Sequence, residues 1–152
     1  LVQENGSRLT KLAVLVTGSP DLAQDVVQET FVELFRHPPP NRKGTLSGWL
    51  SKVAYHRALK EKHKVMDYAP IEINELTDKE LSPPDSLLKY EDDKRLFQII
   101  QSLDEIHRAT ILLRFYGEHS LAEIADILEI PTGTVKSRLF NAVKQCRKKM
   151  KD

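Results

Sequence analysis

The sequence predicts an all-α protein made of two small helical domains, a three-helix N-terminal domain and a four-helix C-terminal domain with a helix-turn-helix. Apolar residues recur with the period of amphipathic helices along most of the chain, and no sustained alternating stretch predicts a sheet. A length of 152 residues is sufficient for two such domains. We expect them at residues 1–64 and 85–152, joined by an acidic linker at 65–84.

Three helices are expected in the N-terminal domain. The first contains the apolar stretch from Leu9 to Val16. The second begins at Ser19-Pro20-Asp21, because Ser is a favourable N-cap and Pro is tolerated at the first helical position, and it ends before Pro38-Pro39-Pro40. The third runs from about Leu46 to Lys64. The side chains expected to face the core are Leu22, Val26, Val27, Phe31, Leu34 and Phe35 in the second helix, and Leu46, Trp49, Leu50, Val53 and Ala54 in the third.

The linker is predicted from its acidic residues, its three prolines and its lack of a period. Helical periodicity resumes near Ser86, and a second helix, expected at Ile106–Tyr116, follows a capping residue at Asp104. Ser120 and Glu123 form a capping box, which starts a short third helix. Pro131 ends that helix, and Thr132 is expected to cap a fourth one that begins near Gly133.

The last two helices, separated by a tight turn, are typical of a helix-turn-helix. The inner side of the fourth helix is expected to consist of Val135, Leu139, Ala142, Val143, Cys146 and Met150. The opposite side carries hydrogen-bonding and basic side chains suited to base edges and phosphates. No acid lies between Glu129 and Asp152, which favours DNA binding over a merely solvated helix.

Composition and spacing exclude several other classes of protein. The chain has 40% hydrophobic and 30% charged residues, which is typical of a folded soluble protein. Its longest apolar run, Leu12–Val16, is far shorter than the roughly 20 residues that span a bilayer, and no signal peptide is apparent, so we expect a cytoplasmic protein. The single cysteine and five histidines show no metal-binding spacing, and no cofactor is implied.

Charge is segregated along the chain although the net charge is only +1. Two basic segments, residues 52–64 with a net charge of +4 and residues 131–152 with +6, flank an acidic segment at 65–93 with −7. Two separate basic segments allow a chain to contact a polyanion at two places. The pattern favours nucleic acid as a partner.

Three segments resemble the extracytoplasmic-function (ECF) class of sigma factors in the sigma-70 family. Residues 120–139, SLAEIADILEIPTGTVKSRL, resemble the C-terminal helix-turn-helix, and GTVKSRL is their most characteristic part. Residues 21–35, DLAQDVVQETFVELF, resemble the polymerase-binding helix, and residues 48–59, GWLSKVAYHRAL, resemble the promoter-melting helix. The resemblance covers nearly the whole chain, and it implies a region 2 domain at 1–64 and a region 4 domain at 85–152.

The resemblance implies a sigma factor that binds core RNA polymerase and directs promoter-specific transcription initiation. The implied partners are the clamp helices and flap region of the polymerase, duplex DNA at the minus-35 element and the unpaired non-template strand at the minus-10 element. The resemblance leaves open whether a dedicated anti-sigma factor is a further partner. No enzyme activity is implied.

Three sets of residues are assigned to these partners. The polymerase set lies together on the second helix, away from its apolar side. The minus-10 set combines basic and aromatic groups, which suit splayed single-stranded bases. In the minus-35 set, Asn141 is the candidate for direct base reading, and Arg138 and Lys148 are candidates for phosphate contacts. The polymerase set is Asp25, Gln28, Glu29, Val32 and Arg36; the minus-10 set is Lys52, Tyr55, His56, Leu59, Lys60 and His63; the minus-35 set is Thr132, Thr134, Lys136, Ser137, Arg138, Asn141, Lys144 and Lys148.

The sequence departs from the family pattern at several positions. His56, Lys60 and His63 stand where the family commonly has Asn, Asp and Arg, so the minus-10 contacts transfer less well than the minus-35 contacts. Glu129 stands where a Gly often makes the turn, and a left-handed conformation there has a modest cost. The chain also begins within the first helix of the family, so part of the polymerase-binding surface is expected to be missing.

Three alternatives are weaker. Another helix-turn-helix regulator, such as a response-regulator output domain, does not account for the DVVQETF and GWL motifs. An enzyme with a DNA-binding tail needs clustered carboxylates or a positioned nucleophile, whereas the acids here cap helices, lie in the polymerase set or fall in the linker. The changes at His56, Lys60 and His63 keep open a degenerate, sigma-like interaction protein without promoter-melting activity.

Overall fold

The computed structural model describes residues 2–39, 45–68 and 91–151, and every regular element within these ranges is helical. This confirms the predicted all-α class. The N-terminal half consists of α1 (Val2–Thr17), α2 (Pro20–Arg36) and α3 (Leu46–Tyr68), and each of these helices packs against the other two.

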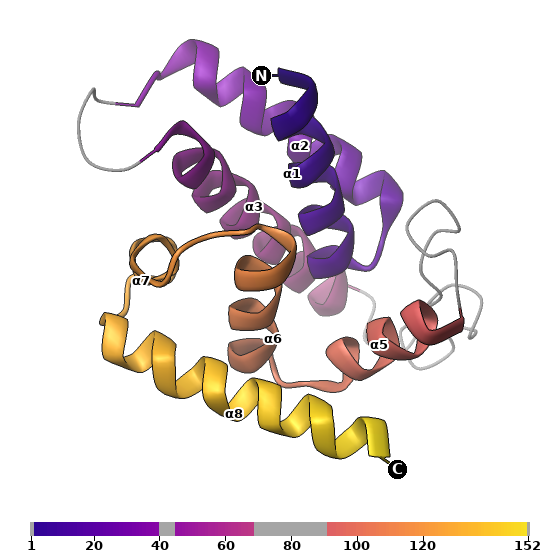
Figure 1. Cartoon of the computed structure of the whole chain (residues 1–152). Coiled ribbons are helices and arrows are strands. Elements are labelled where there is room, and N and C mark those ends of the chain that lie inside the picture. Colours follow the sequence, from indigo (N-terminus) through magenta and orange to yellow (C-terminus); the bar gives the residue numbers. More distant parts are fainter. Residues whose placement is uncertain (1, 40–44, 69–90, 152) are drawn as a thin grey trace.

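The C-terminal half lies below the N-terminal half in Figure 1, with α6 between the N-terminal helices and α8. Its last helix, α8, forms the outer edge of the molecule. The elements of this half are α5 (Glu91–Ser102), α6 (Glu105–Ile111), the π-helical segment η1 (Leu112–Tyr116), α7 (Leu121–Leu128) and α8 (Thr132–Lys151).

The predicted helix starts at Ser19, Asp104 and Ser120 are confirmed. The Ser19 hydroxyl accepts a hydrogen bond from the Leu22 N–H, and the Asp104 carboxylate accepts one from the His107 N–H. At α7 both bonds of the capping box are present, since Ser120 accepts from the Glu123 N–H and Glu123 accepts from the Ser120 N–H. These caps satisfy N–H groups that the helices leave unpaired.

Two predicted boundaries are wrong. Helix α3 continues to Tyr68, so the first four residues of the expected linker are helical. Thr132 is the first residue of α8 rather than its cap, because the Pro131 carbonyl already accepts hydrogen bonds from the N–H groups of Thr134 and Val135. The rest of the expected linker, and the expected helix start near Ser86, lie outside the described residues.

The helix expected at Ile106–Tyr116 ends in the wider turn of η1. There the Gly117 N–H donates to the Leu112 carbonyl over 2.9 Å. A Cβ at Gly117 would lie 2.7 Å from His119 Cδ2 and 2.9 Å from the Leu113 carbonyl oxygen. The close return of the chain therefore requires glycine at this position.

Three side chains that were expected to face the core are exposed instead. Phe35 is 80% exposed, and Leu46 and Met150 are also exposed. Each lies in the first or last turn of its helix, beyond the part that packs against a neighbour. The central positions follow the prediction: Val26, Leu50, Ala54, Val135, Ala142 and Cys146 are buried.

Helix α1 is buried on all sides over the segment Leu12–Val16. The five consecutive residues Leu12–Val16 are all buried, and five residues cover more than one full turn of a helix. One side of α1 packs against α2 and α3, and another packs against η1 of the C-terminal half. In addition, the Gln101 amide of α5 donates to the Leu15 carbonyl over 2.7 Å. The two halves therefore share one core through α1.

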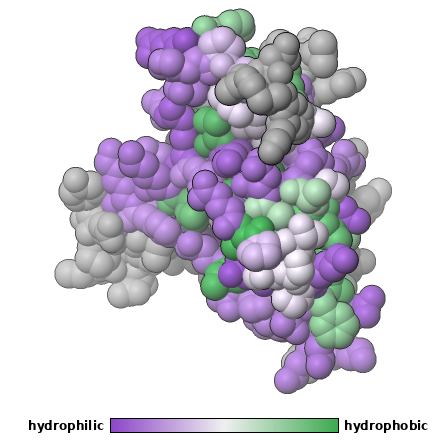
Figure 2. Space-filling view, turned by 90° about the vertical axis from the view of Figure 1, so that its left-hand side faces the viewer, coloured by the Kyte–Doolittle hydropathy of each residue, from purple (hydrophilic) through white to green (hydrophobic). Residues whose placement is uncertain are grey.

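The face of the molecule on which α7 lies is mainly hydrophilic. Figure 2, a view from the side on which α7 lies, shows hydrophobic residues in separate patches among hydrophilic ones. Among the helices that the structure describes, none combines the length and apolar character needed to cross a membrane.

We expect Gly117→Ala to destabilise the protein by about 1–3 kcal/mol, because the new methyl group overlaps His119 and the Leu113 backbone. The measurement is the free energy of unfolding in urea. The matched control is Gly133→Ala in α8, where an added Cβ meets no atom within 4 Å. This control should be neutral or stabilising by up to about 1 kcal/mol, since alanine favours helix. Equal stability of the two variants would show that the approach at Gly117 is not tight.

Candidate nucleic-acid and partner interfaces

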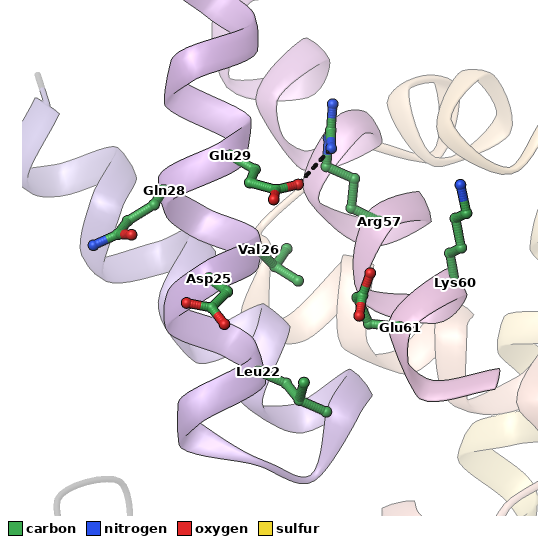
Figure 3. A pocket seen from close by; sticks show the side chains of 8 residues that line it. All are labelled: Leu22, Asp25, Val26, Gln28, Glu29, Arg57, Lys60 and Glu61. Atoms are coloured by element: carbon green, nitrogen blue, oxygen red, sulfur yellow. Dashed lines mark hydrogen bonds and ion pairs between the residues drawn. The ribbon is translucent and has the colours of Figure 1, made fainter. Parts of the chain in front are cut away.

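The polymerase set lies on the exposed side of α2. All five residues are exposed, and Asp25, Gln28 and Glu29 line a shallow cleft of about 290 Å³ between α2 and α3. Figure 3 shows this cleft, whose α3 side carries Arg57 and Glu61. Charged groups from both helices therefore border an open, accessible surface.

Arg57 connects the two walls of this cleft. Its guanidinium donates to Glu29 over 2.8 Å and to Glu33 over 3.2 Å. These ion pairs fix α3 against α2 and partly neutralise Glu29. Asp25 is therefore the more available acid of the polymerase set.

Phe35 extends this surface and was missed by the sequence analysis. It is largely exposed and lies one turn after Val32, which is also exposed. The apolar period of α2 assigned Phe35 to the core, so only its position at the helix end could have indicated exposure. Asp25, Gln28 and Glu29 form an acidic stripe along α2. Val32 and Phe35 together add an apolar patch at the C-terminal end of this stripe.

The minus-35 set lies along α8. Its members are exposed except Thr134 and Arg138, which are half-buried. The buried residues Val135, Ala142 and Cys146 hold the opposite side of the helix in the core. No acidic residue occurs in α8, so its outer side presents cations and uncharged polar groups.

The turn between α7 and α8 sets the direction of α8 relative to α7. Glu129 has the left-handed conformation considered from the sequence, with φ of 58°. The Ile130 N–H donates to the Ala125 carbonyl over 3.0 Å and closes the end of α7. Within α8, Ser137 donates its hydroxyl proton to the Thr134 carbonyl, so its oxygen is left as an acceptor. Phe140, beside Asn141, is also exposed and was not predicted as a surface residue.

The minus-10 set lies mostly against the C-terminal half. The His56 ring donates from Nε2 to the Ile127 carbonyl over 2.8 Å, and His63 Nε2 donates to Glu105 over 2.8 Å. Lys52 Nζ lies 3.7 Å from Asp126. Leu59 borders a small pocket that is also lined by Ala109 and Leu112, while Lys60 is exposed beside the α2 cleft.

Tyr55 is the most buried member of the minus-10 set, with 5% of its surface exposed. Burial and the nearby Glu105 carboxylate, partly opposed by Arg108, raise the pKa of Tyr55 to about 12. Its ring meets that of His56 edge to face, with the centroids 5.3 Å apart. The ring is therefore not available for stacking on bases in this arrangement.

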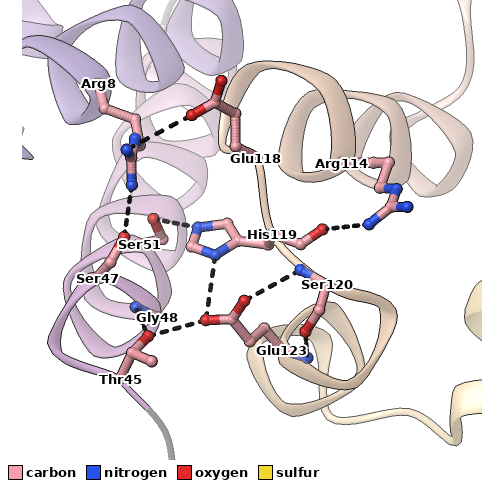
Figure 4. A network of polar contacts seen from close by, with 10 residues as sticks. All are labelled: Arg8, Thr45, Ser47, Gly48, Ser51, Arg114, Glu118, His119, Ser120 and Glu123. Carbon is pink, nitrogen blue, oxygen red and sulfur yellow. Dashed lines mark hydrogen bonds and ion pairs between the residues drawn. The ribbon is translucent and has the colours of Figure 1, made fainter.

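A buried polar network joins the halves around His119 (Figure 4). His119, at the start of the turn into α7, is 2% exposed, and its Nε2 lies 2.6 Å from the Ser51 hydroxyl of α3. Its Nδ1 lies 3.6 Å from Glu123, which accepts a 2.8 Å hydrogen bond from the Thr45 hydroxyl. On the border of the network, Arg8 of α1 donates to Ser47 and pairs with Glu118 over 3.5 Å.

The protonation of this network follows from burial and hydrogen bonding. Burial lowers the pKa of His119, and Arg8 adds to this effect, while Glu123 opposes it. Burial acts to raise the pKa of Glu123, but hydrogen bonds from Ser120 and Thr45, together with the nearby His119, outweigh it and lower that pKa. Neither residue belongs to a predicted set, because no local pattern relates His119 to Ser51, which lies 68 positions earlier.

In the described ranges, no group of three or more His, Cys, Asp or Glu side chains is placed to hold a metal ion.

Comparison with known proteins gives matches over both halves of the chain. The sigma-70 region 2 family model matches residues 1–64, and the sigma-70 region 4 family model matches residues 99–148. The ECF RNA polymerase sigma factor SigL of Mycobacterium tuberculosis is 31% identical over 150 residues, which span 97% of this chain and 85% of SigL. SigW of Bacillus subtilis is 28% identical over 159 residues, which span 95% of this chain and 84% of SigW.

Two solved structures share the fold. One is the sigma factor RpoE from Bartonella quintana in complex with the anti-sigma factor NepR, with a TM-score of 0.79, 17% identity and coverage of 99% of this chain and 94% of RpoE. The other is CnrH in complex with the cytosolic domain of CnrY, with a TM-score of 0.70, 19% identity and coverage of 99% and 84%.

We expect acidification to lower the free energy of unfolding, because His119 is buried in its neutral form. The pKa of His119 is lower in the folded protein than its ordinary value of 6.5, so the unfolded chain takes up the proton first as the pH falls. The stability that depends on neutral His119 is complete above that ordinary value and is lost as the pH falls toward the folded-state pKa. The free energy of unfolding should therefore drop between about pH 7.5 and about pH 5.5 by more in the wild type than in His119→Gln.

The control for this measurement is His37→Gln, since His37 is an exposed residue at the end of α2. This variant should keep the wild-type dependence on pH. An equal loss of stability in the wild type and His119→Gln would contradict the role given to His119.

Proposed function

Because this chain belongs to the sigma-70 family as an extracytoplasmic-function RNA polymerase sigma factor, we propose that α2, α3 and α8 carry its polymerase, minus-10 and minus-35 contacts. The observation that carries this assignment is the separation of two accessible surfaces, the acidic stripe of α2 and the acid-free outer side of α8. A chain with these surfaces on opposite halves can hold polymerase and duplex DNA at the same time. The direct test is run-off transcription with purified bacterial core polymerase on a promoter library.

The polymerase set provides a docking surface for the clamp helices of the largest polymerase subunit. Asp25 and Gln28 are exposed beside the α2–α3 cleft, and Val32 and Phe35 add an apolar end. Acidic groups next to an apolar anchor suit a basic, helical partner, since charge steers the encounter and the anchor contributes affinity.

The minus-35 set provides the duplex-binding surface. Ser137, Asn141 and Lys144 follow one another along the exposed side of α8, at the spacing of successive helical turns. Asn offers the paired donor and acceptor that suit adenine, while Arg138 and Lys148 suit phosphates. The capped α7 and the left-handed turn at Glu129 hold this helix at a fixed angle to the rest of the half.

The minus-10 set would bind unpaired bases with Tyr55 as a stacking surface and with Lys52, Lys60 and the histidines near the phosphates. We further infer that an anti-sigma factor is a partner, as in the complex of RpoE with NepR. Sigma factors select promoters rather than catalyse reactions, so we assign no enzyme activity. Association with core polymerase implies a cytoplasmic site of action.

We expect Asp25→Lys to weaken the retention of core polymerase about tenfold, because it reverses an exposed charge of the polymerase set. The Asp25 side chain is exposed, so circular dichroism should show an unchanged fold. The measurement is a pull-down with core polymerase over a range of concentrations. Glu129→Lys, which makes the same charge change on the other half, should bind like the wild type. Unchanged retention by folded Asp25→Lys would remove Asp25 from this surface.

We expect Asn141→Ala and Lys148→Ala to affect DNA binding differently. Loss of the Asn141 amide should relax the preference at one base pair by about 1–3 kcal/mol. Loss of Lys148 should weaken binding to all sequences and reduce the salt dependence by about one charge. The measurement is binding of the full chain to a panel of minus-35 duplexes at several salt concentrations. An altered base preference in Lys148→Ala but not in Asn141→Ala would reverse the two roles.

A further inference from the structure

Lys62 of α3 borders a small pocket between the two halves and belongs to none of the three assigned sets. The pocket has a volume of about 10 Å³, which is room for about one water molecule. Lys62 is half-buried, so its side chain reaches solvent on one side and borders this narrow space on the other. The lining residues are Val16, Tyr55, Leu59, Lys62, Glu105, Arg108, Ala109 and Leu112.

The charges around Lys62 do not balance its own charge. Arg108 of α6 adds a second cation to the pocket, and its guanidinium is held in place by a 2.7 Å hydrogen bond to the Leu103 carbonyl. Glu105, the carboxylate that lines the pocket, is bound by His63 over 2.8 Å. Among the residues that the structure describes, none forms an ion pair with Lys62.

These surroundings favour the neutral amine. Burial lowers the pKa of Lys62, and Arg108 adds to this effect, while Glu105 opposes it. A lysine that is partly desolvated beside another cation becomes a better nucleophile near neutral pH, because a larger fraction of it carries a free electron pair. Tyr55, the remaining titratable group among the lining residues, stays protonated and uncharged, since its pKa is about 12.

The basic end of α3 also attracts anions. Lys60 and Lys64 are exposed on either side of Lys62, and Glu61 is the single acid between residues 52 and 64. Small anions are therefore concentrated at this end of the helix. Acyl phosphates combine negative charge with an activated acyl group, and they are small enough to reach a half-buried amine.

We propose that Lys62 is a site of Nε-acylation by acyl phosphates. The neutral amine attacks the acyl carbon, a C–N bond forms, and the bond between this carbon and the phosphate oxygen breaks. Inorganic phosphate leaves with the electron pair of that bond, and the amine proton passes to the phosphate or to water. The step needs no oxidant or reductant. The product is an uncharged amide, which lowers the net charge of residues 52–64 from +4 to +3 and reduces the attraction of α3 for a polyanion.

The test is the acetylation rate of each lysine in the full chain, measured by quantitative mass spectrometry with isotope-labelled acetyl phosphate. At about pH 7.5 we expect Lys62 to react about threefold faster than Lys60 and Lys64, its exposed neighbours on α3, or more. This lead should shrink as the pH rises toward 10.5, the ordinary pKa of lysine, because all amines then lose their protons. It should also disappear in urea, where the folded surroundings of Lys62 are lost.

Charge variants on α6 separate this cause from simple accessibility. Arg108→Gln removes the second cation and should slow the acetylation of Lys62, whereas Arg108→Lys keeps a cation and should leave the rate nearly unchanged. Glu105→Gln removes the opposing carboxylate and should raise the rate. Circular dichroism checks that each variant folds. If Arg108→Gln does not fold, Glu105→Gln and the pH profile still decide the outcome.

Three results would overturn the proposal. The first is a rate at Lys62 no higher than at Lys60 and Lys64 near neutral pH. The second is a lead of Lys62 that persists in urea, and the third is a lead that neither Arg108→Gln nor Glu105→Gln changes. All three would leave the polymerase and DNA assignments as they are, because Lys62 belongs to none of those sets.

Discussion

The burial of Leu12–Val16 of α1 on all sides is the constraint on which the rest of the structure depends. Five consecutive apolar residues cannot all face one neighbour on a helix, so Leu12–Val16 require packing partners in more than one direction. Helices α2 and α3 supply one, and the C-terminal half supplies the other. A short apolar run in the first helix therefore determines how the two halves, and the surfaces proposed for binding on each, are placed.

The departures from the family pattern at His56 and His63 have a structural counterpart in this interface. Both histidines donate hydrogen bonds to the C-terminal half, one to a helix-end carbonyl and one to a carboxylate. His119 contributes a third contact from the other side. Three of the five histidines in the chain thus lie between the halves. An imidazole suits this place, because it can pack against apolar groups and still offer an N–H.

Local signals predicted most of the helices and the division of α8 into a buried and an exposed side. Capping residues and prolines act within a few positions, and the apolar period of α8 directly separates Val135 and Ala142 from Asn141 and Lys148. The π-helical segment η1 was not predictable, because it depends on the close return of the chain at Gly117. The cover over Tyr55 and the network at His119 were also missed, because both depend on residues more than 40 positions apart. Phe35 shows that a period alone does not indicate where packing stops.

The shared position of α1 limits how such chains can recombine. Each half could be exchanged as a unit in evolution, since each carries a helix that we propose to bind a separate partner. In this chain, however, the Leu15 carbonyl is bound by Gln101 of the C-terminal half, and Ser51 meets His119 inside the interface. A C-terminal half taken from a relative would need to match these groups as well as its promoter element. The two halves must therefore remain compatible at α1, and changes in the outer side of α8 alone, the side proposed to read DNA, disturb this interface least.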